Sequence, residues 1–530
     1  MGHVRRLAQG KPTGLTRLAS PSNGIRFSIS DLSPPTTRLL KCLYRERAPI
    51  SLFDALSSSS ALTFPDETIK LVSQTLARFN AIAVDDFGVP SNQVRVFATE
   101  AMRRAQNATA MLEAIRAAAP GLSVCILAPQ VETLFGSVGA RSGFVDVKGL
   151  FLDLGGGSVQ MTYLDTSAAK TSPQEVDLGA EIGAALAGQS LPFGAARLIK
   201  VLETADADTQ TAQISQLRGG MSEAFRTLCA RFPTLATAAS DKAGIDIYLC
   251  GGGFRGYGSM LMHHHAVQPY PVPSVGSFTV SGASFVQTKE LLEFNKSFEG
   301  KIFGMSKRRR SQFPAIVAVV DALIGAVPPI RSVTFCAGGN REGALMVGLP
   351  SEIRDSNPLV SFDDATRSPA PPIPGTEPAC VRDVLDTLQS AFPQDLHLDT
   401  SVTVFGLQLG ALYADQIWTR LGDDAESNAA AALHNVITRP DQPGLTHLAR
   451  AVLGVTLCAR WGASLAPIDD LLHQNLRALM DAADPDATFW ADFTGAVTAA
   501  MATVVKRWPK TPRALKDNIR CVIPFQGRFS

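Results

Sequence analysis

The sequence lacks an excess of charge of either sign. Its 49 lysines and arginines are almost balanced by 48 aspartates and glutamates, which leaves a formal net charge of +1. A chain with so small a net charge has no overall field that would steer it to nucleic acid or to an acidic membrane surface. We therefore expect neither nucleic acid nor a membrane as a direct partner.

Paired cysteines are also missing. The eight cysteines are scattered, and none stands in the CxxC spacing that zinc sites and thiol–disulfide motifs use. This distribution favours reduced, mostly buried thiols in a reducing compartment over a disulfide or zinc framework. The cysteines are Cys42, Cys125, Cys229, Cys250, Cys336, Cys380, Cys458 and Cys521.

No uninterrupted apolar run is long enough to span a bilayer. The best candidate, AIVAVVDALIGAV at 315–327, is broken by Asp321 and followed by Pro328 and Pro329, so it predicts a core helix. The first 30 residues contain arginines and no acidic residue before Asp31, as a mitochondrial transit peptide would. We expect a cytoplasmic protein, with a mitochondrial location as the alternative.

What the sequence does contain is a set of short apolar runs that end in glycines. Strands that end in glycine turns and open into helices indicate an α/β fold with a ligand at the C-terminal ends of the strands. Several such runs suggest two related halves that hold one phosphorylated ligand between them. The runs are Phe151–Gln160 (FLDLGGGSVQ), Ile245–Gly258 (IDIYLCGGGFRGYG) and Ser332–Leu345 (SVTFCAGGNREGAL).

The first of these runs has the composition of a phosphate site. Asp153 ends a buried strand and can hold a metal-bound water. The three glycines at 155–157 let the backbone approach a phosphate closely, and successive backbone N–H groups can form an anion-binding concavity. Ser158 adds a hydroxyl donor. Gln160 places an amide where a carboxylate would help a phosphatase.

The remaining pattern predicts a mainly helical end after an α/β part. Strands are predicted at Gly24–Asp31, Val94–Ala98 and Leu122–Ala128, and helices at Asp66–Ala81, Thr99–Ala119 and Glu132–Gly139. Residues 1–21 contain several basic residues and two prolines and predict only a poor strand, which we interpret as an alternative or misassigned first exon.

Composition, together with the repeat of the strand–glycine pattern after Asp165, divides the chain into four parts. Ser356–Pro378 is rich in proline and poor in large apolar residues, as a linker is. The chain after it is rich in alanine and leucine at helical spacing. We therefore predict one lobe at 1–165, a second lobe at 166–355, the linker at 356–378 and a helical domain at 379–530.

Five phrases in order resemble the exopolyphosphatase and guanosine-pentaphosphate phosphohydrolase (Ppx/GppA) family over about residues 20–350. They are FATEAMRRAQNA, LAPQVETLFGSVGARSGF, FLDLGGGSVQ, YLCGGGFRG and CAGGNREGAL. The resemblance implies a two-lobed actin-like ATPase fold of the acetate kinase, sugar kinase, Hsp70 and actin class. Each lobe is then a ribonuclease-H-like half, and a C-terminal all-α domain follows.

Within this family, further phrases are similar to the fungal retrograde regulation protein 2 group. These are SNGIRFSISDLSPPTTR, FGSVGARSGF, GGGFRGYG and SKRRRSQFPA. That resemblance implies signalling from mitochondria to nucleus and control of transcription factors. It also implies a regulatory protein partner, and a homodimer is one possible assembly.

The family resemblance assigns roles to individual residues. It implies that Glu132 is the catalytic general base and that Asp153 holds Mg²⁺, which can arrive with the ligand. The ligand would be a nucleotide such as ATP, or polyphosphate. The resemblance places the phosphate or nucleotide contacts at Ser22, Asn23, Arg103, Gly155, Gly156, Gly157, Ser158, Gly251, Gly252 and Gly253.

Two positions depart from the family pattern. Gln160 replaces a glutamate that helps hold magnesium, and the first phosphate loop has Ala19 and Pro21 where an aspartate and a glycine are usual. Magnesium prefers oxygen ligands that include one or two carboxylates, so these changes weaken the metal site. Phosphate binding would persist without efficient hydrolysis.

Two hypotheses therefore stay open. The first is a regulatory sensor that binds nucleotide or phosphate and presents a surface to a signalling partner. The second is an active phosphohydrolase with Glu132 as general base; a sugar or acetate kinase is a weaker third. The resemblance places the basic run Lys307–Arg310 near the ligand cleft, and we expect the adjacent His263–His265 to serve a loop or core role.

Overall fold

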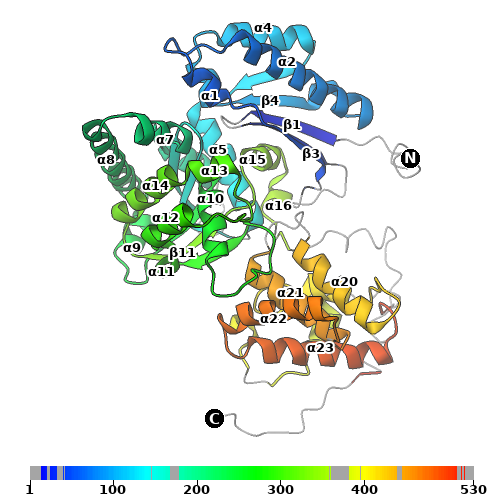
Figure 1. The fold of residues 1–530 in the computed structure, drawn as a ribbon. Helices are drawn as coiled ribbons and strands as arrows, with labels where there is room; N and C mark the ends of the chain where they lie inside the picture. The colour runs from blue at the N-terminus through cyan, green and yellow to red at the C-terminus, as the bar shows by residue number, and fades with distance from the viewer. Residues whose placement is uncertain are drawn as a thin grey trace. The chain divides into compact units, whose positions relative to one another are not determined.

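A computed structural model describes two compact units of the chain. One unit contains residues 1–264 and 275–356, and the other contains residues 265–274 and 357–530 (Figure 1). The described residues are 14–20, 24–32, 40, 42–144, 146–166, 178–356, 358–359, 381–393, 396–438, 445–462, 464–509, 515 and 518–519.

The first lobe is built on a five-stranded mixed sheet in the order β3-β2-β1-β4-β5. Strands β1 and β2, and β2 and β3, pair antiparallel, whereas β4 is parallel to both β1 and β5. The strands are β1 (Gly14–Ser20), β2 (Ile25–Asp31), β3 (Cys42–Ala48), β4 (Val94–Ala98) and β5 (Ser123–Ile126).

Strand β1 corrects one prediction. Residues 1–21 were expected to make a poor strand, yet β1 lies in the centre of the sheet. It pairs with β2 from Gly14↔Asp31 to Ala19↔Arg26 and with β4 on its other side. Backbone hydrogen bonds from two neighbouring strands outweigh a weak local preference, because strand propensity depends strongly on context.

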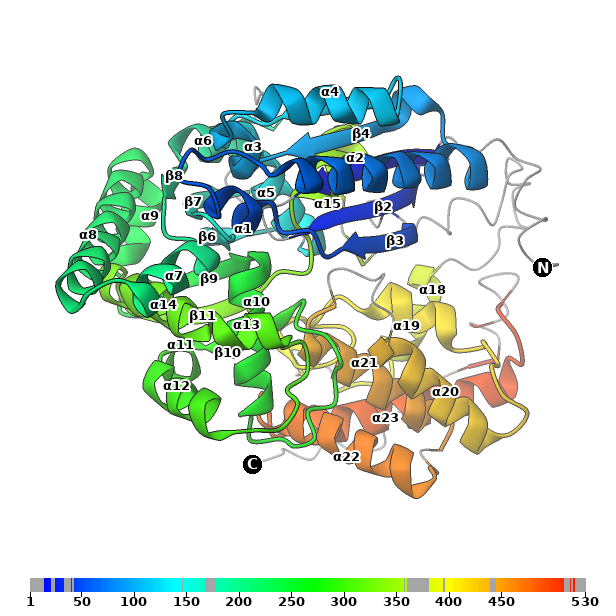
Figure 2. The ribbon, with the colours of Figure 1, turned by 45° about the horizontal axis from the view of Figure 1, so that its top comes forward.

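Helices α2 (Asp66–Ala81) and α4 (Ala108–Ala118) run across this sheet (Figure 2). Phe79 of α2 stacks on Phe27 of β2 with ring centroids 4.7 Å apart. The helix predicted at Thr99–Ala119 is divided into α3 (Glu100–Arg104) and α4. The division has a local cause, because the Asn107 side chain bonds the backbone N–H and C=O of Phe64 at 2.8 and 2.9 Å.

The second lobe is built on a six-stranded sheet in the order β10-β11-β9-β6-β7-β8. Strands β11, β9 and β6 are parallel, and the outer pairs are antiparallel. The strands are β6 (Lys148–Leu154), β7 (Val159–Asp165), β8 (Gln189–Leu191), β9 (Ile245–Cys250), β10 (Phe278–Ser281) and β11 (Ile330–Phe335).

The boundary between the lobes differs from the predicted one at residue 165. Strand β6 pairs with β9 from Leu150↔Ile247 to Asp153↔Cys250, so β6 and β7 belong to the second sheet. Composition does not mark the observed boundary before β6, because the strands on both sides of that boundary are equally apolar. The glycine run that ends β6 therefore lies in the second lobe.

Helices complete the first unit. The apolar run at 315–327 is confirmed as a core helix, since Phe313, Val319, Val320 and Leu323 of α14 are fully buried. The helices in order are α1 (Leu52–Ser57), α5 (Pro129–Ala140), α6 (Gly179–Ala187), α7 (Ala195–Thr204), α8 (Ala207–Arg231), α9 (Pro233–Ala239), α10 (Gly251–His263), α11 (Gly282–Phe285), α12 (Thr288–Ser297), α13 (Lys307–Ser311), α14 (Phe313–Ala326), α15 (Asn340–Met346) and α16 (Ser351–Arg354).

Helices α5 and α15 pack backbone against backbone. A Cβ on Gly343 of α15 would overlap the carbonyl oxygen of Phe135, and a Cβ on Gly139 of α5 would overlap the carbonyl oxygen of Gly339. Only glycine allows such an approach. The contact fixes the distance between two helices that both reach the candidate site.

The second unit is helical in its described part, as predicted. Its core surrounds α21, in which Val452, Leu453 and Val455 are fully buried. Nothing in the sequence indicated that residues 265–274 would fold with this unit. Its helices are α18 (Val381–Gln389), α19 (Gly410–Gln416), α20 (Ala425–Thr438), α21 (His447–Arg460), α22 (Pro467–Asp481) and α23 (Ala487–Val504).

Two α/β lobes and a helical unit confirm the predicted fold class. Most of the predicted linker, residues 360–378, lies outside the described residues. Among the helices that the structure describes, none is both long and apolar enough to cross a membrane.

Candidate functional site

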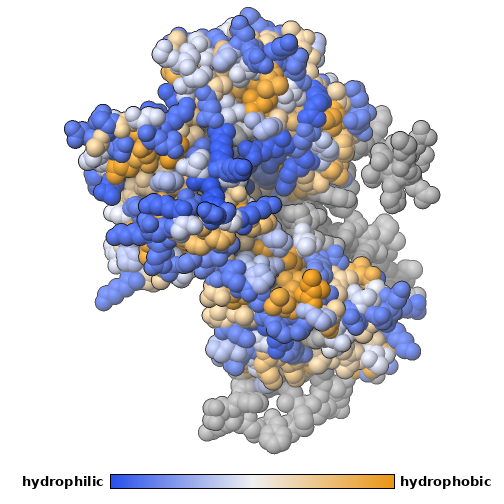
Figure 3. Space-filling model, in the orientation of Figure 1, coloured by the Kyte–Doolittle hydropathy of each residue, from blue (hydrophilic) through white to orange (hydrophobic). Residues whose placement is uncertain are grey.

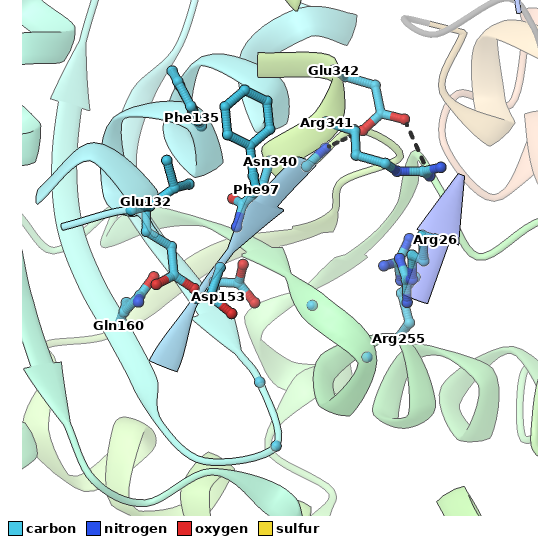
Figure 4. A pocket seen from close by; sticks show the side chains of 18 of the residues that line it. Arg26, Phe97, Glu132, Phe135, Asp153, Gln160, Arg255, Asn340, Arg341 and Glu342 are labelled. Atoms are coloured by element: carbon cyan, nitrogen blue, oxygen red, sulfur yellow. Dashed lines mark hydrogen bonds and ion pairs between the residues drawn. The ribbon is translucent and has the colours of Figure 1, made fainter. Parts of the chain in front are cut away.

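A pocket opens where the two lobes of the first unit meet at the ends of their strands (Figure 4). The first lobe contributes residues of β2, β3 and β4, and the second contributes the glycine turns after β6, β9 and β11 together with α5, α10 and α15. The lining residues are Arg26, Arg45, Phe97, Thr99, Leu127, Glu132, Phe135, Asp153, Gly155, Gly156, Ser158, Gln160, Gly251, Gly252, Arg255, Ala337, Gly338, Gly339, Asn340, Arg341 and Glu342.

Backbone hydrogen bonds from the start of α7 fix the turn between β6 and β7. The carbonyl oxygens of Gly155 and Gly156 accept hydrogen bonds of 3.0 Å from the amides of Ala195 and Ala196 at the start of α7. These bonds turn the carbonyl oxygens away from the pocket, where they would repel an anion. The turn therefore presents a surface suited to a phosphate.

Gly157 lies behind this surface and does not line the pocket. A Cβ at this position would overlap the carboxylate of Glu100, so the third glycine faces α3 and not the ligand space. Gly253 has a similar structural role, because a Cβ there would lie 2.5 Å from the Leu154 side chain. Of the six predicted glycines, Gly155, Gly156, Gly251 and Gly252 line the pocket.

Asp153 lies half-buried at the end of β6. It lies opposite Gln160 across the antiparallel pair and next to Cys250 of β9. Burial raises the pKa of Asp153, and the positive charges of Arg255 and Arg26 oppose the rise. Gly251 has a φ of +87°, and a Cβ there would overlap the Asp153 carboxylate, so glycine is required beside it.

Glu132 lies in the first turn of α5 and is held by an arginine. Arg103 of α3 donates from Nη1 to Glu132 Oε2 at 2.8 Å and to the carbonyl oxygen of Leu127 at 2.7 Å. Burial raises the pKa of Glu132, with Arg103 opposing and the charges of Asp153 and Glu100 adding to the rise. A raised pKa suits a general base, but the carboxylate is already paired.

Arg103 does not lie where the family resemblance implied. It is absent from the pocket wall and instead stands behind Glu132, which does line the pocket. The guanidinium is occupied by Glu132 and by a backbone carbonyl. A phosphate placed in this pocket would therefore face other cations.

Those cations are arginines that the sequence reasoning missed. Arg26 of β2, Arg45 of β3, Arg255 of α10 and Arg341 of α15 line the pocket. Figure 4 shows Arg26 and Arg255 together on one side, with Glu132, Asp153 and Gln160 on the other. The space-filling view shows hydrophilic residues gathered over the region where the lobes meet (Figure 3).

Like charges repel one another within this arginine cluster. Burial, together with the charges of Arg255, Arg341 and Arg47, lowers the pKa of Arg26 to about 9 against the opposing effect of Glu342. Burial also lowers the pKa of Arg309 to about 10, with Arg255 and Arg47 contributing. An anion that binds here would relieve this repulsion.

The carboxylates that face the cluster do not neutralise it. Glu342 ion-pairs with Arg341 at 3.6 Å and accepts a hydrogen bond from the Gly339 amide at 3.1 Å. Burial alone would raise the pKa of Glu342, but the charges of Arg341, Arg45 and Arg255 hold it below its usual value. Within the described part of the chain, no carboxylate forms an ion pair with Arg26, Arg45 or Arg255.

The basic run of α13 does not line the pocket, and of its residues Arg309 lies next to α10. Arg309 packs against Gly256 of α10 and donates to the Gly304 carbonyl oxygen. Arg308 ion-pairs with Asp54 at 2.7 Å, and Arg310 donates to backbone carbonyls, including that of Gly300 at 3.0 Å. Arg308 and Arg310 therefore have structural roles.

Other predicted residues lie elsewhere. Ser22 and Asn23 fall outside the described residues, as does Pro21, while Ala19 lies in β1. His263 ends α10 and contacts Phe298 with the rings tilted and their centroids 4.9 Å apart, as a structural histidine would. No group of three metal-ligating side chains occurs among the residues that the structure describes.

The donor set of the pocket fits a metal ion only in part. Asp153 offers one carboxylate and Gln160 one amide oxygen from the adjacent strand. Magnesium takes six oxygen ligands and is commonly held by one or two carboxylates with phosphate oxygens and water. The residues present therefore fit magnesium that arrives with a phosphorylated ligand.

Comparison with known proteins gives consistent matches. Residues 32–352 match the Ppx/GppA phosphatase family, and residues 374–518 match the RTG2 C-terminal domain. Retrograde regulation protein 2 of Saccharomyces cerevisiae is 30% identical over 472 residues, which cover 87% of this chain and 74% of that protein.

Solved structures are more distant in sequence. The Ppx/GppA phosphatase of Aquifex aeolicus, in its type II variant, is 18% identical with a TM-score of 0.44, over 64% of this chain and 100% of that chain. An exopolyphosphatase from Cytophaga hutchinsonii is 17% identical with a TM-score of 0.44, over 63% of this chain and 96% of that chain.

Proposed function

Because this chain belongs to the Ppx/GppA phosphatase family, we propose that it is a signalling regulator whose pocket binds the phosphate groups of a nucleotide or of polyphosphate. One observation carries the proposal. Arg26, Arg45 and Arg255 line the pocket without a carboxylate partner among the described residues. Like charges gathered at one pocket repel one another, and a polyanion is the ligand that offsets this repulsion.

The signalling role rests on the helical unit and on the named relative. Residues 374–518 match the RTG2 C-terminal domain, and the relative that covers most of the chain is a retrograde regulation protein. We assign this chain the same kind of role: signalling from mitochondria to nucleus that controls transcription factors. It would act in the cytoplasm through a regulatory protein partner.

Phosphate recognition would use both sides of the pocket. The glycine turn at 155–158 would bind one phosphate group, and Arg26 and Arg255 would neutralise the phosphate groups next to it. Magnesium carried by the ligand would be held by Asp153 and Gln160 and would supply further charge neutralisation. Phe97, which also lines the pocket, would pack against an apolar part of the ligand.

Calorimetric titration with magnesium tripolyphosphate and with magnesium ATP tests the binding site. Replacing Asp153 by alanine should weaken binding about tenfold in the presence of magnesium, because the one carboxylate ligand is lost. In EDTA the same variant should bind at least as well as wild type, because a carboxylate that repels phosphate is gone.

Asp246→Asn is the matched control, since Asp246 ion-pairs with Arg331 and does not line the pocket. Equal dissociation constants for wild type and Asp153→Ala, with and without magnesium, would place the ligand elsewhere.

An active magnesium-dependent phosphohydrolase is the second candidate. One observation favours it: burial raises the pKa of Glu132, as expected for a general base. Against it stand the ion pair of Glu132 with Arg103 and the amide of Gln160 beside Asp153. The carboxylate of Glu132 is thus already paired, and the residue opposite Asp153 offers an amide in place of a second carboxylate.

Phosphate release from polyphosphate, guanosine pentaphosphate and ATP separates the two candidates. We expect only a slow background release that Glu132→Gln does not change. A working general base contributes about 10² to 10⁴ in rate. A loss of that size in Glu132→Gln, with binding retained, would establish the hydrolase.

A further inference from the structure

Helix α10 begins at the pocket. Gly251 and Gly252 line the pocket at its first turn, and Arg255 lines it one turn later. No side chain separates this helix start from strand β6, because a Cβ on Gly251 would overlap the Asp153 carboxylate. A displacement of the end of β6 at the pocket therefore moves the start of α10 directly.

The body of α10 is buried and regular. Its 13 residues extend over about 20 Å. Phe254, Tyr257 and Met260 are fully buried, and the Tyr257 hydroxyl donates to the Phe285 carbonyl oxygen at 2.7 Å. Such a helix moves as one piece, so its two ends are linked mechanically.

The chain enters the second unit directly after α10. Residues 265–274, which we call the strap, belong to the helical unit. The Tyr270 hydroxyl shares a 2.7 Å hydrogen bond with Nδ1 of His447, and Asn475 donates to the Pro269 carbonyl oxygen at 2.9 Å. Val272 is fully buried in the hydrophobic core of that unit.

We propose that α10 and the strap couple ligand occupancy of the pocket to the helical unit; this rests on the proposed function and adds its regulation. A phosphate bound at Gly251 and Arg255 acts on the first turn of α10. The strap passes the resulting shift to the core around Val272 and His447. Coupling between two sites is reciprocal, so a protein that binds the helical unit changes ligand affinity by the same factor.

The tryptophans report on the helical unit alone. All four, Trp418, Trp461, Trp490 and Trp508, fall in that unit. Trp418, Trp461 and Trp508 pack against the hydrophobic core that contains Val272. Magnesium tripolyphosphate is a suitable probe because it does not absorb where tryptophan is excited.

The experiment compares tryptophan emission with calorimetric binding on the full chain. In the wild type, tripolyphosphate should change the emission as the pocket fills. In the double variant Tyr270→Phe, Asn475→Ala, which loses two hydrogen bonds of the strap, the change should fall at least about threefold. Its dissociation constant should stay within about tenfold of the wild-type value, as expected for moderate coupling.

Tyr163→Phe is the matched control. It removes a tyrosine hydroxyl that donates to Thr234 Oγ1 at 3.1 Å within the first unit, outside both α10 and the strap, and it should keep the full emission change. Circular dichroism checks that each variant is folded, and Tyr270→Phe alone replaces the double variant if that one is not.

Binding without an emission change in wild type, or a full change in the strap variant, would overturn the coupling and leave the proposed function in place. Absence of calorimetric binding would overturn both.

Discussion

Replacing Arg255 by alanine should weaken binding of magnesium tripolyphosphate about 30-fold, equivalent to about 2 kcal/mol. Arg255 is the centre of the arginine cluster, because its charge shifts the pKa of Asp153, Arg26, Arg309 and Glu342. Its removal takes away one charge-assisted contact to phosphate and weakens the field on the others. Calorimetric titration measures the change.

The same variant should keep its stability. Removing Arg255 relieves repulsion on Arg26 and Arg309, which offsets the packing that the side chain loses. The unfolding temperature of the ligand-free protein should therefore change little, although affinity falls. A parallel loss of affinity and stability would indicate a structural role for Arg255 instead.

Two further substitutions control for this result. Arg255→Lys keeps the charge but loses the planar fork, so it should bind with intermediate affinity. Arg331→Ala removes an exposed arginine that ion-pairs with Asp246 away from the pocket, and it should bind as wild type does. Full affinity in Arg255→Ala would rule out the cluster as the phosphate site.

Gly343→Ala should destabilise the first unit by about 3 kcal/mol, at the upper end of overpacking effects. The added Cβ would overlap the carbonyl oxygen of Phe135 on α5, and backbone atoms cannot rotate away as a side chain would. The loss should exceed the gain of about 1 kcal/mol that alanine brings to a helix interior. Scanning calorimetry follows this unit, because tryptophan emission does not report on it.

Gly219→Ala also replaces a helical glycine by alanine, but we expect it to change the stability in the opposite direction. Gly219 lies in α8, and a Cβ there would have no neighbour within 4 Å. The change should stabilise the protein by up to about 1 kcal/mol through helix propensity. If both variants behaved alike, the close contact of α5 and α15 would not be the cause of the Gly343→Ala effect.

The local elements of this chain could be predicted from its sequence. Helix Asp66–Ala81 and strand Val94–Ala98 have the predicted bounds, and the buried helix at Phe313–Ala326 was expected from its apolar run. Apolar periodicity and the glycines that end an element act over a few residues, so both can be recognised directly in the sequence. Asp153 was singled out from the apolar run and glycines around it, whereas Glu132 came only from the family resemblance; both line the pocket.

The features that were missed depend on residues far apart in the chain. The arginine cluster combines Arg26, Arg255 and Arg341 from three segments, and each arginine alone resembles a surface residue. Arg26 and Arg255 did stand inside the quoted phrases GIRFSISD and GGGFRG, which was the available signal. Strand β1 was missed because its stability comes from its two neighbours in the sheet.

The strap also limits how far the two units can be regarded as independent modules. A chain cut at residue 356 would keep residues 265–274 but lose the core that buries Val272 and the histidine that bonds Tyr270. The remaining fragment would expose an apolar segment, which promotes aggregation. Likewise, a fragment that began after residue 356 would lack part of its own hydrophobic core, so the two units are expected to be inherited and expressed together.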